Sequence, residues 1–273
     1  MLLIWQMLKK MAKGRCNVEA TKIVKIKKVK DGIVDTADEV VVVEYDLTIF
    51  INGKYFITLL CTPKNLDELV WGYLFSEGVL ISKEDLLRMS IDEEMKRADV
   101  RIAREEIFTY SGDQLFGKMT VTTACGKGRK VTYPIVRKGA DKEIKTVDIE
   151  PEKILFLVNK FNRHSDIFDK TGGVHSCGLC DESEMIIFRD DIGRHNAMEK
   201  ILGRAMMDGI DLSEKIVLTT GRVSSEIIEK IILRGIPILV SRSAPTGAAI
   251  ELAKRAGVKL IGFARGNRMN IYA

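Results

Sequence analysis

The spacing of apolar positions changes near the middle of this chain. In the first half, short runs rich in Val, Ile, Thr and Tyr alternate with polar residues, and Gly- or Asn-containing turns separate them, which predicts strands. Two such runs are Thr21–Val29 and Val40–Phe50. The clearest signal is Asn52-Gly53 between Ile49–Ile51 and Tyr55–Ile57, which is typical of a hairpin with a two-residue turn.

Helix signals follow this hairpin. We expect Asn65 to cap a helix that runs through Phe75, with Glu68 completing a capping box and Gly78 ending the helix. Ser82 is expected to cap a second, shorter helix. Two further strands are predicted, at 100–103 and 118–123.

The second half alternates β-prone runs with runs of helical spacing. Pro151 is expected to open a helix that ends near Phe161. The alternation that follows predicts a largely parallel sheet with covering helices, since short runs of Ile, Leu and Val suit strands buried on both faces. The predicted strands are 185–188, 216–219, 238–241 and 259–263, and the predicted helices are 196–207, 225–233 and 247–256.

A polar, charged stretch at 139–147 predicts a domain boundary. The 273 residues suit one large domain or two small ones. We therefore expect a β-rich N-terminal part over 1–140 and an α/β domain over 141–273.

Composition narrows the classes of function. The net charge of +5 suits an anionic small ligand better than a nucleic-acid surface. Five cysteines are an odd number in a chain too long to need disulfides, and no secretory signal is evident, which favours a reducing cytoplasm. The apolar stretch Met1–Leu8 is too short to span a bilayer, so no membrane association is expected.

Four predicted strands end in segments that share a composition. Each segment combines Arg with Gly, Ser or Thr, and three of them lead into helices, whose free N–H groups favour anions. Strand ends of this kind form the ligand-binding edge of α/β sheets, so an anionic, phosphate-bearing ligand is predicted. Ordinary helix caps and surface arginines are the alternative. The segments are 190–196, 219–226, 241–247 and 263–268.

Cys125 lies in a basic, glycine-containing segment. Gly126 and Gly128 free the backbone, while Lys127, Arg129 and Lys130 supply positive charge. Nearby cations lower a thiol pKa, and the thiolate is the nucleophile, so Cys125 is a candidate catalytic residue. The alternative is a small, buried cysteine at a strand end.

The spacing His175-Ser176-Cys177-Gly178-Leu179-Cys180 leaves three interpretations open. A Cys-x-x-Cys pair with a nearby His could bind zinc, and Cys125 could supply a fourth ligand. The pair could instead act in redox chemistry or sulfur relay. The third interpretation is simple packing at a helix start. His195, beside Arg194, is expected to contact a ligand rather than a metal.

Several longer segments, in this order, resemble the formate dehydrogenase accessory sulfurtransferases, the FdhD family. The likeness extends from about Leu47 to the C-terminus. The matching segments are Cys61-Thr62-Pro63, Leu69 through Gly78, Thr171-Gly172-Gly173-Val174-His175, Asp191 through Asn196, Thr220-Gly221-Arg222 and Ser241 through Thr246.

This resemblance implies a sulfur-transfer function. A member of this family takes sulfur from a cysteine desulfurase and passes it to the molybdenum bis(molybdopterin guanine dinucleotide) cofactor destined for formate dehydrogenase. The carrier cysteine, held as a persulfide, matches Cys125. The resemblance also implies a cytidine deaminase-like C-terminal domain and a homodimer. No residue is assigned to a metal, and zinc binding by Cys177 and Cys180 stays open. Its cofactor-binding stretch matches Phe263, Ala264, Arg265, Gly266, Asn267 and Arg268, with Arg194 and Arg222 expected to assist.

Two departures qualify the resemblance. Many relatives carry a second cysteine three residues after the first, where this chain has Gly128, so Cys177 or Cys180 could substitute for it. A zinc-dependent deaminase would need His-x-Glu and Pro-Cys-x-x-Cys, and neither is present around His175. A chaperone that binds the molybdenum cofactor without covalent sulfur chemistry is the alternative function.

Overall fold

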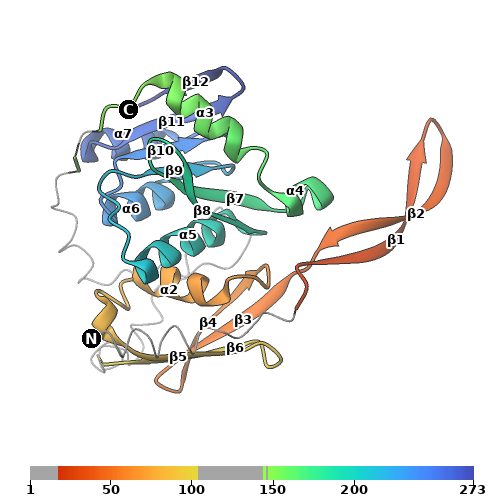
Figure 1. The fold of residues 1–273 in the computed structure, drawn as a ribbon. Helices are drawn as coiled ribbons and strands as arrows, with labels where there is room; N and C mark the ends of the chain where they lie inside the picture. The colour runs from red at the N-terminus through yellow and green to blue at the C-terminus, as the bar shows by residue number, and fades with distance from the viewer. Residues whose placement is uncertain (1–17, 104–143, 146) are drawn as a thin grey trace.

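A two-stranded β-arm projects from the body of the molecule (Figure 1). The computed structural model describes residues 18–103, 144, 145 and 147–273. Within them, β1 (Thr21–Lys30) and β2 (Ile33–Val42) pair antiparallel along their whole length and join no other sheet. The predicted strand over 40–50 is divided, because β2 ends at Val42 and the chain then enters a different sheet.

A four-stranded sheet forms the base of the body. Its order is β4-β3-β6-β5, and α2 (Leu66–Ser76) covers one face. The predicted hairpin is confirmed: Asn52 and Gly53 join two of its strands at φ 49° and 82°, the left-handed region that such a turn requires. The strands are β3 (Tyr45–Ile51), β4 (Lys54–Cys61), β5 (Leu86–Asp92) and β6 (Arg97–Ile102).

The predicted capping box of α2 is wrong. Asn65 occupies the N-cap in a left-handed conformation, with φ 54°, and its side chain makes no capping hydrogen bond. Glu68 instead forms an ion pair with Arg189, 121 residues along the chain. The cap at Ser82 is confirmed, since the Asp85 carboxylate accepts the Ser82 N–H and a single 3-10 turn follows, Lys83–Asp85.

A six-stranded sheet forms the second half. Its order is β12-β11-β10-β9-β7-β8, and only β9, β10 and β11 pair parallel. The sheet is therefore mixed rather than largely parallel, because β7 and β12 run antiparallel to their neighbours. The strands are β7 (His175–Cys180), β8 (Met185–Asp191), β9 (Ile216–Thr219), β10 (Ile238–Ser241), β11 (Lys259–Arg265) and β12 (Arg268–Ile271).

Helices cover both faces of this sheet (Figure 1). On one face, α3 (Pro151–Phe161) packs over Ile216, Ile238 and Ile261. On the other, α5 (Arg194–Asp208), α6 (Ser225–Leu233) and α7 (Gly247–Ala256) share an apolar core with Val217 and Leu239. These helices, and the α/β class with a β-rich N-terminal part, confirm the prediction. The short α4 (Asp166–Thr171), β7 and β12 were not predicted.

The two sheets are joined through a crossing of α2 and α5, which lie against each other in the centre of Figure 1. Glycine makes the crossing close. A Cβ atom on Gly72 would lie 2.0 Å from the Glu199 carbonyl oxygen, and one on Gly203 would lie 2.0 Å from the Glu68 carbonyl oxygen. The helix backbones therefore touch at these two positions, and no side chain fits between them.

A buried polar network lies beside this crossing. The Lys200 ammonium lies 2.6 Å from the Asp191 carboxylate, and both side chains are fully buried. Asp191 also accepts hydrogen bonds from the backbone N–H and the hydroxyl of Thr62, and from the Asn196 amide. The end of β4 is thus bonded to the end of β8, which explains why two of the family-like segments meet in space.

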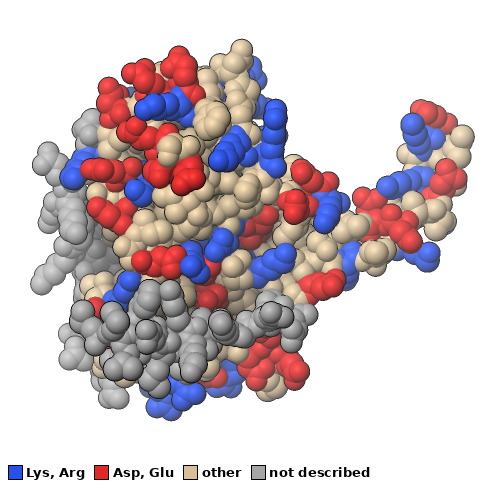
Figure 2. Space-filling model, in the orientation of Figure 1, with Lys and Arg blue, Asp and Glu red and all other residues tan. Residues whose placement is uncertain are grey.

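The surface carries charges of both signs. Figure 2 shows Lys and Arg side chains interspersed with Asp and Glu over the visible face, the arm included. No helix of the described residues is both long enough and apolar enough to cross a membrane.

Candidate functional site

The four Arg-bearing segments at the predicted strand ends lie along one edge of the six-stranded sheet. Since β7 is antiparallel to both β8 and β9, β8 runs in the same direction as β9, β10 and β11. The carboxyl ends of these four strands therefore meet at a common edge, here called the rim. The first residue of β7, His175, lies at the same edge.

A cavity of about 490 Å³ opens at the rim. It combines two aromatic rings, two exposed arginines and several polar groups, which is the composition expected of a site for an anionic ligand. The lining residues are Phe168, Gly172, Gly173, Val174, His175, Ile192, Thr220, Arg242, Ser243, Phe263 and Arg265.

His175 and Thr220 lie together in this cavity. The Thr220 hydroxyl is 3.4 Å from His175 Nδ1 and accepts the backbone N–H of Ser176. Burial lowers the His175 pKa, and the nearby Arg194 and Arg222 lower it further. The imidazole is therefore neutral at pH 7, and the positive charge of the cavity comes from arginine.

Buried hydroxyls hold the rim loops in place. Ser241 Oγ donates to the carbonyl of Gly221 and accepts the N–H of Ser243, so it joins the loops after β9 and β10. Thr219 Oγ1 accepts the N–H of Gly221 within its own loop. The two loops also share a short bridge between Val223 and Pro245. The cavity wall is thus fixed before any ligand binds.

Phe263 reaches the cavity from a distorted part of β11. The pairing of β11 with β12 shifts between Gly262 and Arg265, and Phe263 between them has a φ of 51°. A residue with a side chain costs about 1–3 kcal/mol in such a conformation, and strain of this kind is concentrated at binding sites. The Phe263 N–H donates to the Ser243 carbonyl, which holds the distortion against the neighbouring loop.

His195 lies in the first turn of α5, outside the lining of the cavity. Its Nε2 atom is 3.3 Å from the Glu226 carboxylate. Burial lowers the pKa of His195 to about 3, with Arg194, Lys230 and His175 adding to the effect. The ring is therefore neutral at pH 7 and faces Glu226. The predicted contact of His195 with a ligand stays a prediction.

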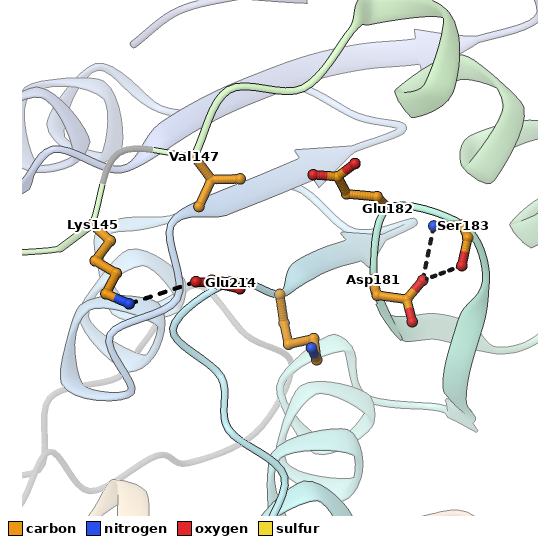
Figure 3. A pocket seen from close by; sticks show the side chains of 7 residues that line it. Lys145, Val147, Asp181, Glu182, Ser183 and Glu214 are labelled. Carbon is orange, nitrogen blue, oxygen red and sulfur yellow. Dashed lines mark hydrogen bonds and ion pairs between the residues drawn. The ribbon is translucent and has the colours of Figure 1, made fainter.

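A second cavity, of about 440 Å³, lies at the opposite edge of the six-stranded sheet (Figure 3). Asp181, Glu182 and Glu214 contribute carboxylates to it. Lys145 forms an ion pair with Glu214 at 3.5 Å, and Asp181 accepts hydrogen bonds from Ser183. This cavity carries more acid than base, so it suits an anionic ligand less well than the rim cavity does.

Comparison with known proteins decides the family. Residues 42–273 match the FdhD/NarQ family. The chain belongs to the FdhD/NarQ family. Three curated relatives, each described as a sulfur carrier protein FdhD, support this assignment. The protein from Bacillus subtilis is 34% identical over 94% of this chain and 97% of its own. The protein from Bacillus pumilus is 40% identical over 85% of this chain and 87% of its own. The protein from Listeria monocytogenes is 37% identical over 91% of this chain and 95% of its own.

A solved structure supports the fold of this FdhD/NarQ protein. It is described as a putative formate dehydrogenase accessory protein from Desulfotalea psychrophila, and the two structures superpose with a TM-score of 0.74. Their sequences are 23% identical, over 93% of this chain and 96% of that one. At this identity the likeness establishes the fold, and the residues of the site need their own argument.

The structure brings together only part of the predicted FdhD cofactor-binding stretch. Phe263 and Arg265 line the rim cavity, whereas Ala264 is fully buried in the core beneath α3. Gly266 and Asn267 form the turn into β12, and Arg268 is exposed across that turn from Arg265. Cys125, with Lys127, Arg129 and Lys130, lies outside the described residues. The assignment of these site residues stays a prediction.

Cys177 and Cys180 occupy opposite faces of the six-stranded sheet. Cys177 belongs to the core beneath α5, and Cys180 to the core beneath α3. A shared zinc ion or a disulfide between them would need both sulfurs on one face. Their burial in the two cores fits the packing interpretation, although the pair lies within β7 rather than at a helix start. A relay between one of these cysteines and Cys125 stays a prediction, because Cys125 lies outside the described residues. Among the described residues, no cluster of three or more His, Cys, Asp or Glu is arranged to hold a metal.

We expect Cys61, Cys177 and Cys180 to resist alkylation in the folded protein. Burial raises the pKa of each thiol to about 12. At pH 8 only about one thiol in 10⁴ is then ionised, against roughly a quarter for an exposed cysteine. Brief treatment with iodoacetamide, followed by peptide mass spectrometry, should leave these three cysteines unmodified, whereas the protein unfolded in urea should react at all of them. Fast native labelling of Cys177 or Cys180 would contradict their structural role.

Proposed function

We propose that this protein carries sulfur as a persulfide on Cys125, from a cysteine desulfurase to the molybdenum bis(molybdopterin guanine dinucleotide) cofactor, for use by formate dehydrogenase. The family assignment supports a sulfur carrier, because the curated relatives bear that name. The structural relative described as a putative formate dehydrogenase accessory protein supports formate dehydrogenase as the target enzyme. The cofactor is the substrate of this reaction rather than a resident group.

The observation that carries the proposal is the rim cavity. A guanine dinucleotide presents phosphates and an aromatic base, and the cavity offers Arg242 and Arg265 together with two phenylalanine rings. Its volume of about 490 Å³ suits one nucleotide end of the cofactor, with the rest extending over the rim. The chemistry of the lining residues therefore fits the proposed substrate.

Sulfur loading needs no outside oxidant. The Cys125 thiolate attacks the terminal sulfur of a persulfide on the desulfurase, a new S–S bond forms on Cys125, and the donor cysteine leaves as a thiolate. Three cations close to Cys125 in sequence favour its thiolate and an anionic substrate. A homodimer acting in the cytoplasm is part of this proposal, as the resemblance to the family implies.

A chaperone that binds the cofactor without covalent chemistry is the alternative function. The same rim cavity supports it, because its described lining residues would bind the cofactor in either function. The two functions differ in what they require of Cys125, since a chaperone would work without it.

We expect Cys125→Ala to abolish sulfur loading. The wild-type protein, incubated with a cysteine desulfurase and cysteine, should gain the mass of one sulfur atom on the peptide that contains Cys125. Cys16→Ala is the matched control and should load like the wild type. Peptide mass spectrometry makes the measurement. Equal loading of Cys125→Ala and the wild type would exclude the persulfide assignment, and a Cys125→Ala variant that still supports formate dehydrogenase activity would favour the chaperone.

A further inference from the structure

Phe168 lines the rim cavity, yet it lies about a hundred residues before the C-terminal stretch 263–268 that the family resemblance assigns to cofactor binding. The residue belongs to α4, a helix of six residues between α3 and β7. Its side chain is 40% exposed, and it belongs to none of the three apolar cores formed by the described residues. Packing in the interior therefore does not explain an aromatic side chain at this position.

Phe263 shares both properties. It is partly exposed, lies outside the same three cores and lines the same cavity, although it comes from the distorted part of β11. The cavity is thus supplied with aromatic rings from two elements that are about a hundred residues apart in the chain. Aromatic rings that are half exposed beside arginines are typical of sites that hold a flat, aromatic, anionic ligand.

The backbone at Phe168 is fixed to the rim. The Phe168 N–H donates to Ser165 Oγ at 3.0 Å, and Ser165 Oγ donates to the Asp190 carboxylate at 2.7 Å. Asp190 also accepts the Ser176 hydroxyl at 2.6 Å, so the start of α4 is bonded to both β8 and β7. These bonds place Phe168 relative to the cavity floor before a ligand arrives, which lowers the entropic cost of stacking.

The other end of α4 rests on the arm. Gly173 lies so close to β2 that a Cβ atom there would be 2.8 Å from Val42 Cγ1. The loop from Gly172 to Val174, which also lines the cavity, is therefore held between β2 and the rim. Both ends of α4 are supported, so the Phe168 ring is presented from a rigid wall.

We propose that Phe168 is a binding residue of the rim cavity that stacks on the aromatic base of the bound nucleotide, while Arg242 and Arg265 attract its phosphates. This inference rests on the proposed function, because it assumes a nucleotide end of the substrate in this cavity. It adds a determinant of base recognition outside residues 263–268.

Calorimetric titration with two probes, GDP and inorganic pyrophosphate, tests the proposal. Stacking contributes only to the probe that has a base, so Phe168→Leu should weaken GDP binding roughly tenfold and leave pyrophosphate binding unchanged. Phe168→Tyr should retain the GDP affinity, because it keeps the ring. Phe156→Leu is the matched control: Phe156 is an exposed phenylalanine on α3 outside the cavity, and its replacement should change neither affinity.

The outcomes separate this inference from the proposed function. GDP binding that is undiminished in Phe168→Leu would overturn the stacking role while the nucleotide site stands. Equal weakening of GDP and pyrophosphate would also overturn it, because a displaced α4 would explain both losses. If the wild type bound neither GDP nor pyrophosphate, the assignment of this cavity to a nucleotide would fail, and the role of Phe168 with it.

Discussion

Replacing Gly203 by alanine is expected to destabilise the protein by more than about 3 kcal/mol, or to prevent folding. In an ordinary helix interior the same change stabilises by roughly 1 kcal/mol, because alanine is the better helix former. Here the new methyl group would lie 2.0 Å from the Glu68 carbonyl oxygen and 2.8 Å from the Gly72 nitrogen. Both are backbone atoms, so α2 and α5 would have to move apart.

Gly247→Ala is the matched control for this prediction. Gly247 is also helical, at the first position of α7, and no atom lies within 4 Å of a Cβ placed on it. Its replacement should change stability by less than about 0.5 kcal/mol. Chemical denaturation of the two variants makes the comparison. A Gly203→Ala variant as stable as Gly247→Ala would mean that the two helices do not cross as closely as described.

Removing the charge of Lys200 is expected to cost about 3–5 kcal/mol of folding stability. Lys200→Met would leave the fully buried Asp191 carboxylate without its cation. It would also remove the hydrogen bonds that the ammonium donates to the carbonyl and hydroxyl oxygens of Thr62. The ion pair itself is not the main source of this loss, since the cost comes from a charge left unpaired where water cannot reach it.

A double-mutant cycle separates these two contributions. Asp191→Asn alone leaves the buried Lys200 ammonium without a counter-charge, whereas Lys200→Met combined with Asp191→Asn leaves no unpaired charge. The double variant should therefore be more stable than the sum of the single losses predicts. Lys153→Met is the control, because Lys153 pairs with Glu182 at the surface, where such pairs contribute little. Strictly additive losses in the cycle would show that Lys200 and Asp191 do not interact directly.

The sequence predicts those elements whose signals are local. The Asn52-Gly53 hairpin, the Pro151 helix and the strand–helix alternation after Met185 all rest on neighbouring residues, and the structure confirms them. β7 was not predicted because its residues, which include Gly178 and two cysteines, have little preference for β-structure. They form a strand because they pair with β8 on one side and β9 on the other.

Some residues of the candidate site were also predictable from local sequence, and others were not. Arginines at the predicted strand ends indicated a binding site at the rim, and Arg242, Phe263 and Arg265 line its cavity. Phe168 gave no signal, because its helix is short and its place at the rim depends on the bond between Ser165 and Asp190. Glu68 was misassigned for a related reason: its partner Arg189 is distant in sequence, and a local capping pattern could not reveal it.

The crossing of α2 and α5 also affects how the chain unfolds. Glu68 in the N-terminal half is buried against Arg189 in the C-terminal half, and Ser76 donates to Glu199 in the same manner. Unfolding of either half would remove the partners of these buried carboxylates. It would also expose the apolar face of α2 or α5, whichever helix stays folded. We therefore expect the two halves to unfold as one cooperative unit, and a fragment that ends between them to lose the surface on which it folds.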